Sequence, residues 1–105
     1  MKEIDAKELK RMFDSKEDFQ LIDVREDYEI EIATLGGEHI PMADVLNHVD
    51  KVRKDKKVVV HCRSGKRSAA VIQALETQHG FTNLYNLQGG ILAYADQIDH
   101  SLTKY

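Results

Sequence analysis

Short runs of apolar residues mark the strands of this chain. Residues 58–60 are three consecutive valines, Leu84–Leu87 is a second short apolar segment, and residues 19–25 carry apolar side chains at four of seven positions. Nearly continuous apolar runs are typical of parallel strands that are buried on both faces of a sheet. The pattern therefore predicts at least three strands of a parallel sheet, and Ile4 is a candidate for a further strand at the start of the chain.

The segments between these strands have helical patterns. Residues 5–14 place Leu9, Met12 and Phe13 on one face, and Asp5 stands where an N-cap is expected. Four further segments are predicted to be helical: residues 26–33, 42–52, 68–79 and 91–98. Strands that alternate with helices predict an α/β fold with three layers, in which a mainly parallel sheet has helices on both faces. A chain of 105 residues is expected to form a single domain, residues 1–105.

Composition and charge narrow the range of functions. The formal net charge is −3 at pH 7, which gives no general electrostatic attraction to nucleic acid or to an anionic membrane. The first twenty residues are rich in Lys, Glu and Asp and contain no apolar stretch of the kind found in a secretory signal. The only cysteine is Cys62, so no internal disulfide can form. A cytoplasmic location, in which thiols stay reduced, is the expectation.

That cysteine directly follows the valine strand and precedes a helix. In open α/β sheets, ligands bind at the carboxyl ends of strands, close to helix amino termini. Residues 63–67 are Arg63, Ser64, Gly65, Lys66 and Arg67. Backbone amides of such a turn, the helix dipole and three cations all favour an anion, and they favour a thiolate at Cys62 over a thiol. Cys62 is therefore predicted to be a sulfur nucleophile within an anion-binding loop.

Two other interpretations of Cys62 are weaker. A lone cysteine is often a small buried apolar residue, but the basic residues that follow this one do not belong in a core. A zinc site is disfavoured because the five histidines are dispersed and only His61 lies beside the cysteine. Since side chains alternate along a strand, His61 is expected on the opposite face from Cys62. No metal ion or other cofactor is predicted.

Four segments in order resemble the rhodanese family of sulfurtransferases in its single-domain form. They are residues 21–26 (LIDVRE), residues 39–41 (HIP) with Ala43, residues 62–68 (CRSGKRS), and Gly80-Phe81 followed by residues 87–91 (LQGGI). Two positions depart from the family pattern. Met42 stands where the family often has glycine, and Tyr94 stands where its last helix usually has tryptophan. The resemblance implies a five-stranded, mainly parallel sheet with flanking helices.

The resemblance also implies a reaction. Cys62 would attack a sulfane-sulfur donor such as thiosulfate, carry the sulfur as a persulfide, and release it to cyanide, a small thiol or a protein thiol. Phosphatases of similar fold have five residues between cysteine and arginine. Cys62 and Arg67 are separated by four, and the tighter loop favours attack on sulfur. The alternatives are a phosphatase or arsenate reductase on the same scaffold, or a non-catalytic rhodanese-like module that binds a partner or senses redox state.

Residue roles follow from this reading. Cys62 is the expected nucleophile, and the main chain of residues 63–67 is expected to hold the substrate anion, with Arg63 and Lys66 as solvent-facing contacts. Ser68 and Asp23 are expected to support the loop. A carboxylate buried within an apolar strand needs a partner. For Asp23 two arrangements are open: an ion pair with Arg67, or a cap on the local turn after Arg25. A structural ion pair is expected between Arg25 and Glu26.

Overall fold

The sheet has five parallel strands, as the sequence led us to expect. The computed structural model describes all residues 1–105. The elements follow in the order β1 (Lys2–Ile4), α1 (Ala6–Asp14), β2 (Gln20–Asp23), α2 (Asp27–Ile32), β3 (Glu38–His39), α3 (Met42–Val45), η1 (Val49–Lys51), β4 (Val58–His61), α4 (Lys66–His79), β5 (Leu84–Leu87) and α5 (Gly90–Gln97). The strand order across the sheet is β1-β5-β4-β2-β3, and every neighbouring pair is parallel. The α/β three-layer prediction is confirmed.

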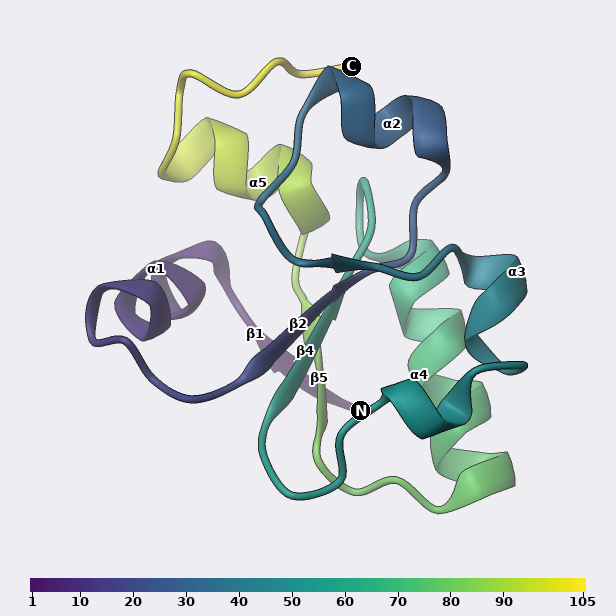
Figure 1. The fold of residues 1–105 in the computed structure, drawn as a ribbon. Coiled ribbons are helices and arrows are strands. Elements are labelled where there is room, and N and C mark those ends of the chain that lie inside the picture. Colours follow the sequence, from purple (N-terminus) through teal and green to yellow (C-terminus); the bar gives the residue numbers. More distant parts are fainter.

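Each face of the sheet has its own apolar cluster. Val58, Val60 and Cys62 belong to one cluster, together with Ile72 and Leu75 of α4. The other cluster lies on the opposite face and contains side chains of α1, β2, β4, β5 and α5: Leu9, Met12, Leu21, Val59, Leu87 and Tyr94. Alternation along β4 therefore fills both layers. Figure 1 shows α1 and α5 on one side of the sheet and α3 and α4 on the other.

Central position makes β4 the most enclosed strand. All four of its residues are buried, and it pairs with β2 on one side and β5 on the other. Its carboxyl end carries the Cys62 loop, by which we mean residues 62–67. In Figure 1 this end of the sheet is the one covered by α2 and by the chain's C-terminal segment. The topology thus brings residues from distant parts of the sequence around one loop.

The predicted helix over residues 42–52 is wrong. The structure has one helical turn at Met42–Val45 and a separate 3-10 turn at Val49–Lys51. The segment is rich in Asp, Asn, His and Val, which are poor helix formers, and a short helix has little hydrogen bonding to offset its nucleation cost. Val45 and Val52 are both buried without a continuous helix between them.

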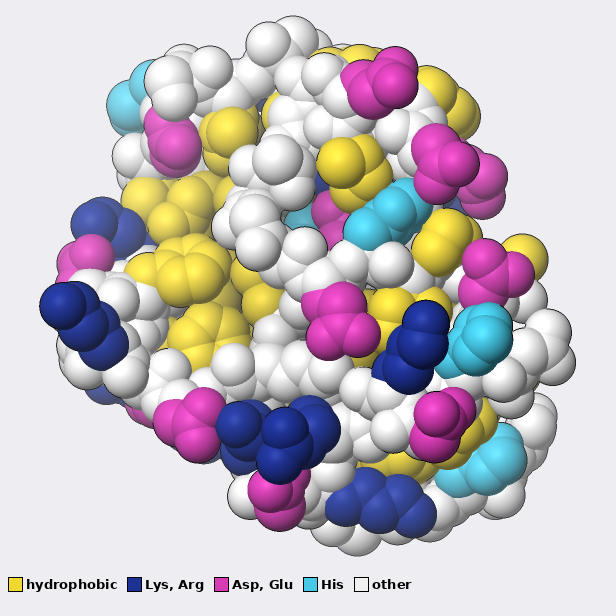
Figure 2. Space-filling view, viewed as in Figure 1, with side chains coloured by type: hydrophobic (Ala, Val, Ile, Leu, Met, Phe, Trp, Pro, Cys, Tyr) yellow, Lys and Arg dark blue, Asp and Glu magenta, His cyan; other side chains and the backbone are white.

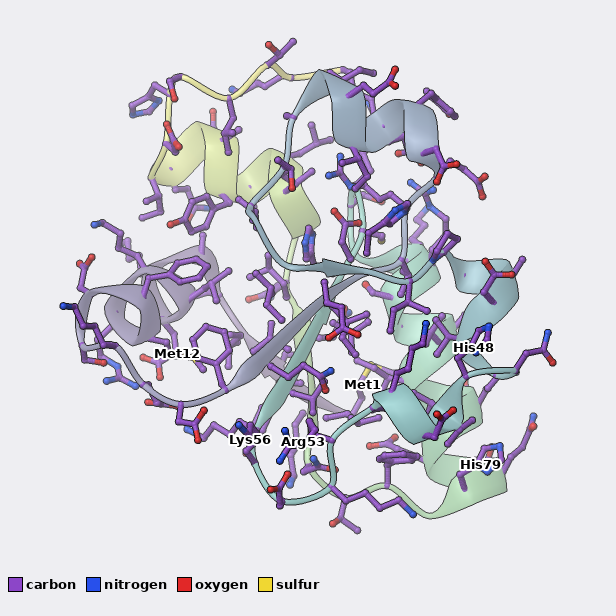
Figure 3. All side chains as sticks on the ribbon, in the orientation of Figure 1. Met1, Met12, His48, Arg53, Lys56 and His79 are labelled. Atoms are coloured by element: carbon purple, nitrogen blue, oxygen red, sulfur yellow. The ribbon has the colours of Figure 1, made fainter.

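The basic residues before β4 lie at the opposite end of this strand from Cys62. Lys57 immediately precedes β4, and Lys56 and Arg53 lie in the same segment that leads into this strand. Figure 3 shows Arg53 and Lys56 at the end of the sheet away from α2, and Figure 2 shows the Lys and Arg side chains gathered along that edge. Arg53 pairs with Asp55, and Lys56 pairs with Asp18. These cations are a solvated surface and take no part in the Cys62 loop.

Candidate functional site

The Cys62 loop curls around the cysteine sulfur. Gly65 has φ +102° and occupies the N-cap of α4, a left-handed conformation that glycine adopts without the steric cost of a side chain. This turn directs the Gly65 N–H at Cys62 Sγ, at 3.1 Å, while the Ser68 N–H donates to the same atom at 3.4 Å. Two main-chain amides at the start of α4 therefore converge on the sulfur.

Cys62 is buried and held in an environment that favours its thiolate. Only 1 % of the residue is exposed. Burial raises the pKa of the Cys62 thiol, but hydrogen bonds with the Ser68 side chain and with the amides of Ser68, Gly65 and Ser64 outweigh it, so the net pKa lies below its ordinary value.

The start of α5 supports the loop from beneath. The Ile91 N–H donates to the Cys62 carbonyl at 3.0 Å, and the Leu92 N–H donates to the Arg63 carbonyl at 3.2 Å. Gly90 makes this approach feasible, because a Cβ placed there would lie 2.3 Å from the Arg63 carbonyl oxygen and 2.6 Å from that of Cys62. The Gly89-Gly90 pair thus does more than turn the chain, since Gly90 lets a helix terminus contact the loop backbone directly.

A buried asparagine on β5 links two residues of this region. The Ser68 hydroxyl donates to Asn86 Oδ1 at 2.6 Å, and Asn86 Nδ2 donates to the Gly65 carbonyl at 3.1 Å. Ser68 Oγ also lies 3.4 Å from Cys62 Sγ. Ser68 was expected beside the loop from the sequence, whereas Asn86 was not. The available signal was a polar residue in the middle of an apolar strand next to the strand that carries Cys62.

Arg67 pairs with Glu29, and not with Asp23. Its Nη1 and Nη2 donate to the two carboxylate oxygens of Glu29 at 2.6 and 2.8 Å. This bidentate pair joins the Cys62 loop to α2. A hydrogen bond from Arg67 is the largest influence on the pKa of Glu29, which falls to about 2. Glu29 itself is buried, with 1 % of the residue exposed.

Asp23 instead binds Arg25, two residues later. Its Oδ1 accepts from the Arg25 main-chain N–H at 3.0 Å, and its Oδ2 accepts from Arg25 Nη2 at 2.8 Å. The local-turn alternative for Asp23 therefore matches the structure. The Arg25–Glu26 ion pair predicted from the sequence is wrong, because Glu26 caps α2 while the Arg25 guanidinium turns inward to Asp23. Asp23 and the Arg25 N–H are two residues apart, so their bond requires less loss of chain entropy than a pair with the distant Arg67 would.

Tyr105 closes the network over this end of the sheet. Its hydroxyl donates to Glu29 Oε2 at 2.6 Å and accepts from Arg25 Nη1 at 2.7 Å. The guanidinium of Arg63 donates to the Tyr105 main-chain oxygen and lies 5.1 Å from the centre of its ring. Arg63 was predicted to face solvent as a substrate contact. It is exposed, but it is also bound to the C-terminal segment.

The other loop positions differ in their freedom. Ser64 and Lys66 are exposed, and the Lys66 ammonium makes no hydrogen bond or ion pair within the chain. Gly65 is buried, and Arg67 is half-buried. The structure thus leaves Lys66 as the cation of the Cys62 loop whose side chain is unengaged.

His61 lies beside Asp23 and is completely buried. Val58, Val60 and Cys62 belong to one apolar cluster and Val59 to the other, so alternation along β4 turns His61 away from Cys62, as expected. Neither ring nitrogen has a hydrogen bond, and Nε2 is 3.5 Å from Asp23 Oδ2. Burial lowers the pKa of His61, which keeps the ring neutral. No group of three or more His, Cys, Asp or Glu side chains is arranged to hold a metal ion.

A hollow in the surface lies away from the cysteine. It has a volume of about 370 Å³ and is lined by residues around the start of β2 and β3: Phe13, Phe19, Gln20, Leu21, Gly36, Gly37 and Glu38. Hydrophobic side chains gather on this face beside α1 (Figure 2). None of its lining residues belongs to the Cys62 loop, so the chemistry of the loop does not extend into this hollow. No helix in the chain combines the length and the apolar character needed to cross a bilayer.

Main-chain amides that converge on a buried cysteine, in a loop between a parallel strand and a helix, form an arrangement that favours an anion. Residues 5–97 match the sequence model of the rhodanese-like domain, and the chain belongs to this family. YtwF of Bacillus subtilis, a sulfurtransferase by name, is 39 % identical over 95 residues, which cover 90 % of each chain. A sulfurtransferase of Allochromatium vinosum is 34 % identical over 94 residues and covers 89 % of this chain and 87 % of its own.

Longer relatives and solved structures agree with this family. The adenylyltransferase/sulfurtransferase MoeZ of Mycobacterium tuberculosis is 32 % identical over 105 residues. The match covers 97 % of this chain but only 26 % of MoeZ. A rhodanese-like domain protein from Staphylococcus aureus has a similar structure, with a TM-score of 0.82 at 30 % identity, over 93 % of this chain and 95 % of that one. Sulfurtransferase activity is therefore supported at the level of the family.

Proposed function

We propose that this chain is a sulfurtransferase in which Cys62 carries a sulfane sulfur from a donor such as thiosulfate to a thiol or cyanide. The observation that carries the proposal is the convergence of the Gly65 and Ser68 amides on Cys62 Sγ, at 3.1 and 3.4 Å. Amides so placed stabilise a thiolate before reaction, and the turn that holds them offers the same donors to a persulfide afterwards. We further propose that residues 1–105 act as one domain.

The first step forms a persulfide. The Cys62 thiolate attacks the outer sulfur of thiosulfate, a new S–S bond forms, and the S–S bond of thiosulfate breaks. Sulfite leaves with the electron pair of that bond, and Cys62 retains the sulfur as Cys62–S–S⁻. Loop amides and the ammonium of Lys66 are the groups placed to offset the charge of the departing sulfite. The guanidinium of Arg63 can join them if it releases the Tyr105 main-chain oxygen.

The second step restores Cys62. Cyanide or a thiolate attacks the outer sulfur of the persulfide and takes it as thiocyanate or as a new persulfide, and the electron pair of the broken S–S bond returns to Cys62. Donor and acceptor thus react in turn at one sulfur atom, which predicts ping-pong kinetics. A thiol acceptor, on a small molecule or on a protein, suits a reducing compartment such as the cytoplasm, where Cys62 would also stay reduced.

Intact-mass measurement tests this proposal. After incubation with thiosulfate, the wild-type protein should gain one sulfur atom and should lose it when cyanide is added, with release of thiocyanate. The Cys62→Ser variant is the control and should gain nothing. An unmodified wild-type mass together with turnover of an aryl phosphate would refute sulfur transfer in favour of a phosphatase. The absence of both activities would refute it in favour of a binding or redox-sensing module.

A further inference from the structure

The Ser68 hydroxyl lies between two groups that compete for its single proton. Asn86 Oδ1 is 2.6 Å from Ser68 Oγ, and Cys62 Sγ is 3.4 Å from the same atom. All three residues are buried, with exposed fractions of 0 % for Ser68, 4 % for Asn86 and 1 % for Cys62. A hydroxyl has one proton and can donate to only one of these two acceptors at full strength.

The orientation of the Asn86 amide settles which acceptor holds that proton when Cys62 is neutral. Asn86 Nδ2 donates to the Gly65 carbonyl at 3.1 Å. A flipped amide would place Oδ1 against that carbonyl, so that two acceptors would face each other, and would present an N–H group to Ser68. Oδ1 therefore faces Ser68 and takes its proton, and Ser68 presents a lone pair to the sulfur. In that state Ser68 can accept from a thiol, and it can donate to a thiolate only by giving up its bond to Asn86.

We infer that Asn86 is a positioning residue that competes with the Cys62 sulfur for the Ser68 hydroxyl proton. The inference rests on the proposed function, because it concerns how strongly the nucleophile of that reaction is stabilised. With a thiol or a persulfide at Cys62, the hydroxyl donates to Asn86. When the thiolate forms, the hydroxyl must leave the 2.6 Å contact with Asn86 before it can donate to sulfur, so the gain on one side is offset by the loss on the other.

This competition weakens the stabilisation that the Ser68 hydroxyl can give to the thiolate and leaves the larger part to the main-chain amides. A thiolate that is stabilised too strongly becomes a weaker nucleophile, and the best attacking thiol has a pKa near the ambient pH. Asn86 thus helps to keep Cys62 reactive while the Gly65 and Ser68 amides keep it ionised. The same asparagine fixes Gly65, so one side chain influences both kinds of donor.

Charges near Cys62 also influence the pKa of its thiol, so wild type and all variants must keep the same charged groups around it. They are Arg63, Lys66 and Arg67 of the loop, Glu29 of α2 with its bond to Arg67, and Tyr105 of the C-terminal segment. On the sides of β5 and α5, the groups that contact the loop are Asn86 and the main chain of residues 90–92. A cycle that changes only Asn86 and Ser68 leaves all these charges in place.

The test is a double-mutant cycle of Asn86→Leu and Ser68→Ala. Leucine has nearly the shape of asparagine without its polar atoms, and the Gly65 carbonyl keeps its bond from the Ala69 N–H at 3.2 Å. The measurement is the pH dependence of iodoacetamide alkylation of Cys62, which gives the pKa of its thiol and requires no sulfur transfer. Any loosening of the loop in Asn86→Leu cancels, because the effect of Ser68→Ala is compared within each background.

We expect Ser68→Ala to shift this pKa by less than about 0.3 when Asn86 is present, since its hydroxyl proton is already engaged. In the Asn86→Leu background the hydroxyl is free to donate to the thiolate, so Ser68→Ala should raise the pKa by about one unit, a roughly tenfold loss of alkylation rate below the pKa. Equal shifts in the two backgrounds would overturn the inference, as would a larger shift with Asn86 present.

Two further variants keep the test decisive. Asn86→Ala replaces Asn86→Leu in the same cycle if circular dichroism shows that the leucine variant is unfolded. Asn83→Leu is the matched control, because Asn83 holds the main chain of Arg53 and Lys56 at the opposite end of the sheet and should leave the Ser68→Ala shift at its wild-type value. A coupled cycle without sulfur uptake from thiosulfate would refute the proposed function alone, whereas sulfur uptake with an uncoupled cycle would refute this inference alone.

Discussion

Replacing Glu29 by glutamine tests how the Cys62 loop is fixed to α2. Glu29 is buried, and its two oxygens accept from Arg67 at 2.6 and 2.8 Å and from the Tyr105 hydroxyl at 2.6 Å. Glutamine keeps the shape of the side chain but removes its charge. Its amide N–H₂ would also face donors of Arg67 or Tyr105. The substitution therefore breaks the bidentate pair while leaving the packing volume nearly unchanged.

The pKa of Glu29 gives the magnitude of the effect. Its fall from an ordinary value of 4.5 to about 2 corresponds to about 3 kcal/mol of stability, at about 1.4 kcal/mol per pKa unit. The Arg67 side chain is 34 % exposed, and solvent on that side screens the pair. We therefore expect Glu29→Gln to lower the free energy of unfolding at neutral pH by about 2 kcal/mol, a large share of the 5–15 kcal/mol typical of such domains.

The stability that Glu29 contributes should depend on pH, because its pKa is lowered in the folded state. A carboxyl group whose folded-state pKa is depressed contributes stability that is complete above its unfolded pKa and is lost as the pH falls through the folded pKa. The difference in stability between wild type and Glu29→Gln should be constant above about pH 5 and should shrink steadily between pH 4.5 and about 2. Urea unfolding followed by circular dichroism at several pH values measures this difference.

Glu31→Gln is the control for this experiment. Glu31 lies in the same helix, is exposed and makes no side-chain hydrogen bond, so its replacement should change stability by less than about 0.5 kcal/mol. An equally small loss of stability in Glu29→Gln and Glu31→Gln at neutral pH would refute the role of the Arg67–Glu29 pair. A large loss in Glu29→Gln that does not diminish in acid would refute it as well, because the loss would then come from packing and not from charge.

Three other substitutions probe the parts of the site separately. Lys66→Ala should raise the KM for thiosulfate severalfold with little change in melting temperature, because its ammonium has no partner in the chain; unchanged kinetics with equal thermal destabilisation would contradict this. Gly90→Ala should destabilise the protein by about 2 kcal/mol or more, because the added Cβ would lie 2.3 Å from the Arg63 carbonyl oxygen and because φ is +62° at this residue. Thermal unfolding measures the loss, and a wild-type melting temperature would disprove the prediction. Tyr105→Phe removes hydrogen bonds to Glu29 and Arg25 and should cost about 1 kcal/mol while leaving sulfur uptake by Cys62 intact; loss of uptake in a folded variant would show that Tyr105 does more than support the network.

The loop and the strand before it could be predicted from the sequence because their determinants are local. Three valines, a cysteine and a glycine within a few residues specify a buried strand and a turn with positive φ. The helix over residues 5–14 was equally accessible, and the structure confirms the Asp5 cap, which accepts from the Glu8 N–H at 2.8 Å. Residues 42–52 have the apolar spacing of one helix, but the structure forms two short helical turns there, so the prediction from periodicity was wrong.

The partners of the loop could not be found in the same way. Glu29 is 38 residues from Arg67, and Asn86 is 18 residues from Ser68, so only the topology of the sheet and α2 brings them together. The sequence predicts only a helix over residues 26–33, and nothing in the spacing of its acidic residues separates Glu29 from Glu31. The Asp23–Arg25 contact lay within reach, because an aspartate that bonds the backbone two residues later is a common turn feature.

The way charge is distributed around Cys62 bears on the choice between sulfur and phosphoryl transfer. Both terminal nitrogens of Arg67 are bound to Glu29, and the Arg63 guanidinium is bound to Tyr105. A phosphoryl group has three equatorial oxygens that need donors at once, and cations committed to carboxylate or main-chain oxygens supply few. A persulfide concentrates its charge on one outer sulfur, which the main-chain amides of a small turn can approach without any guanidinium. The network that fixes Arg67 to α2 therefore fits the proposed sulfur transfer, because the persulfide of that reaction needs no guanidinium.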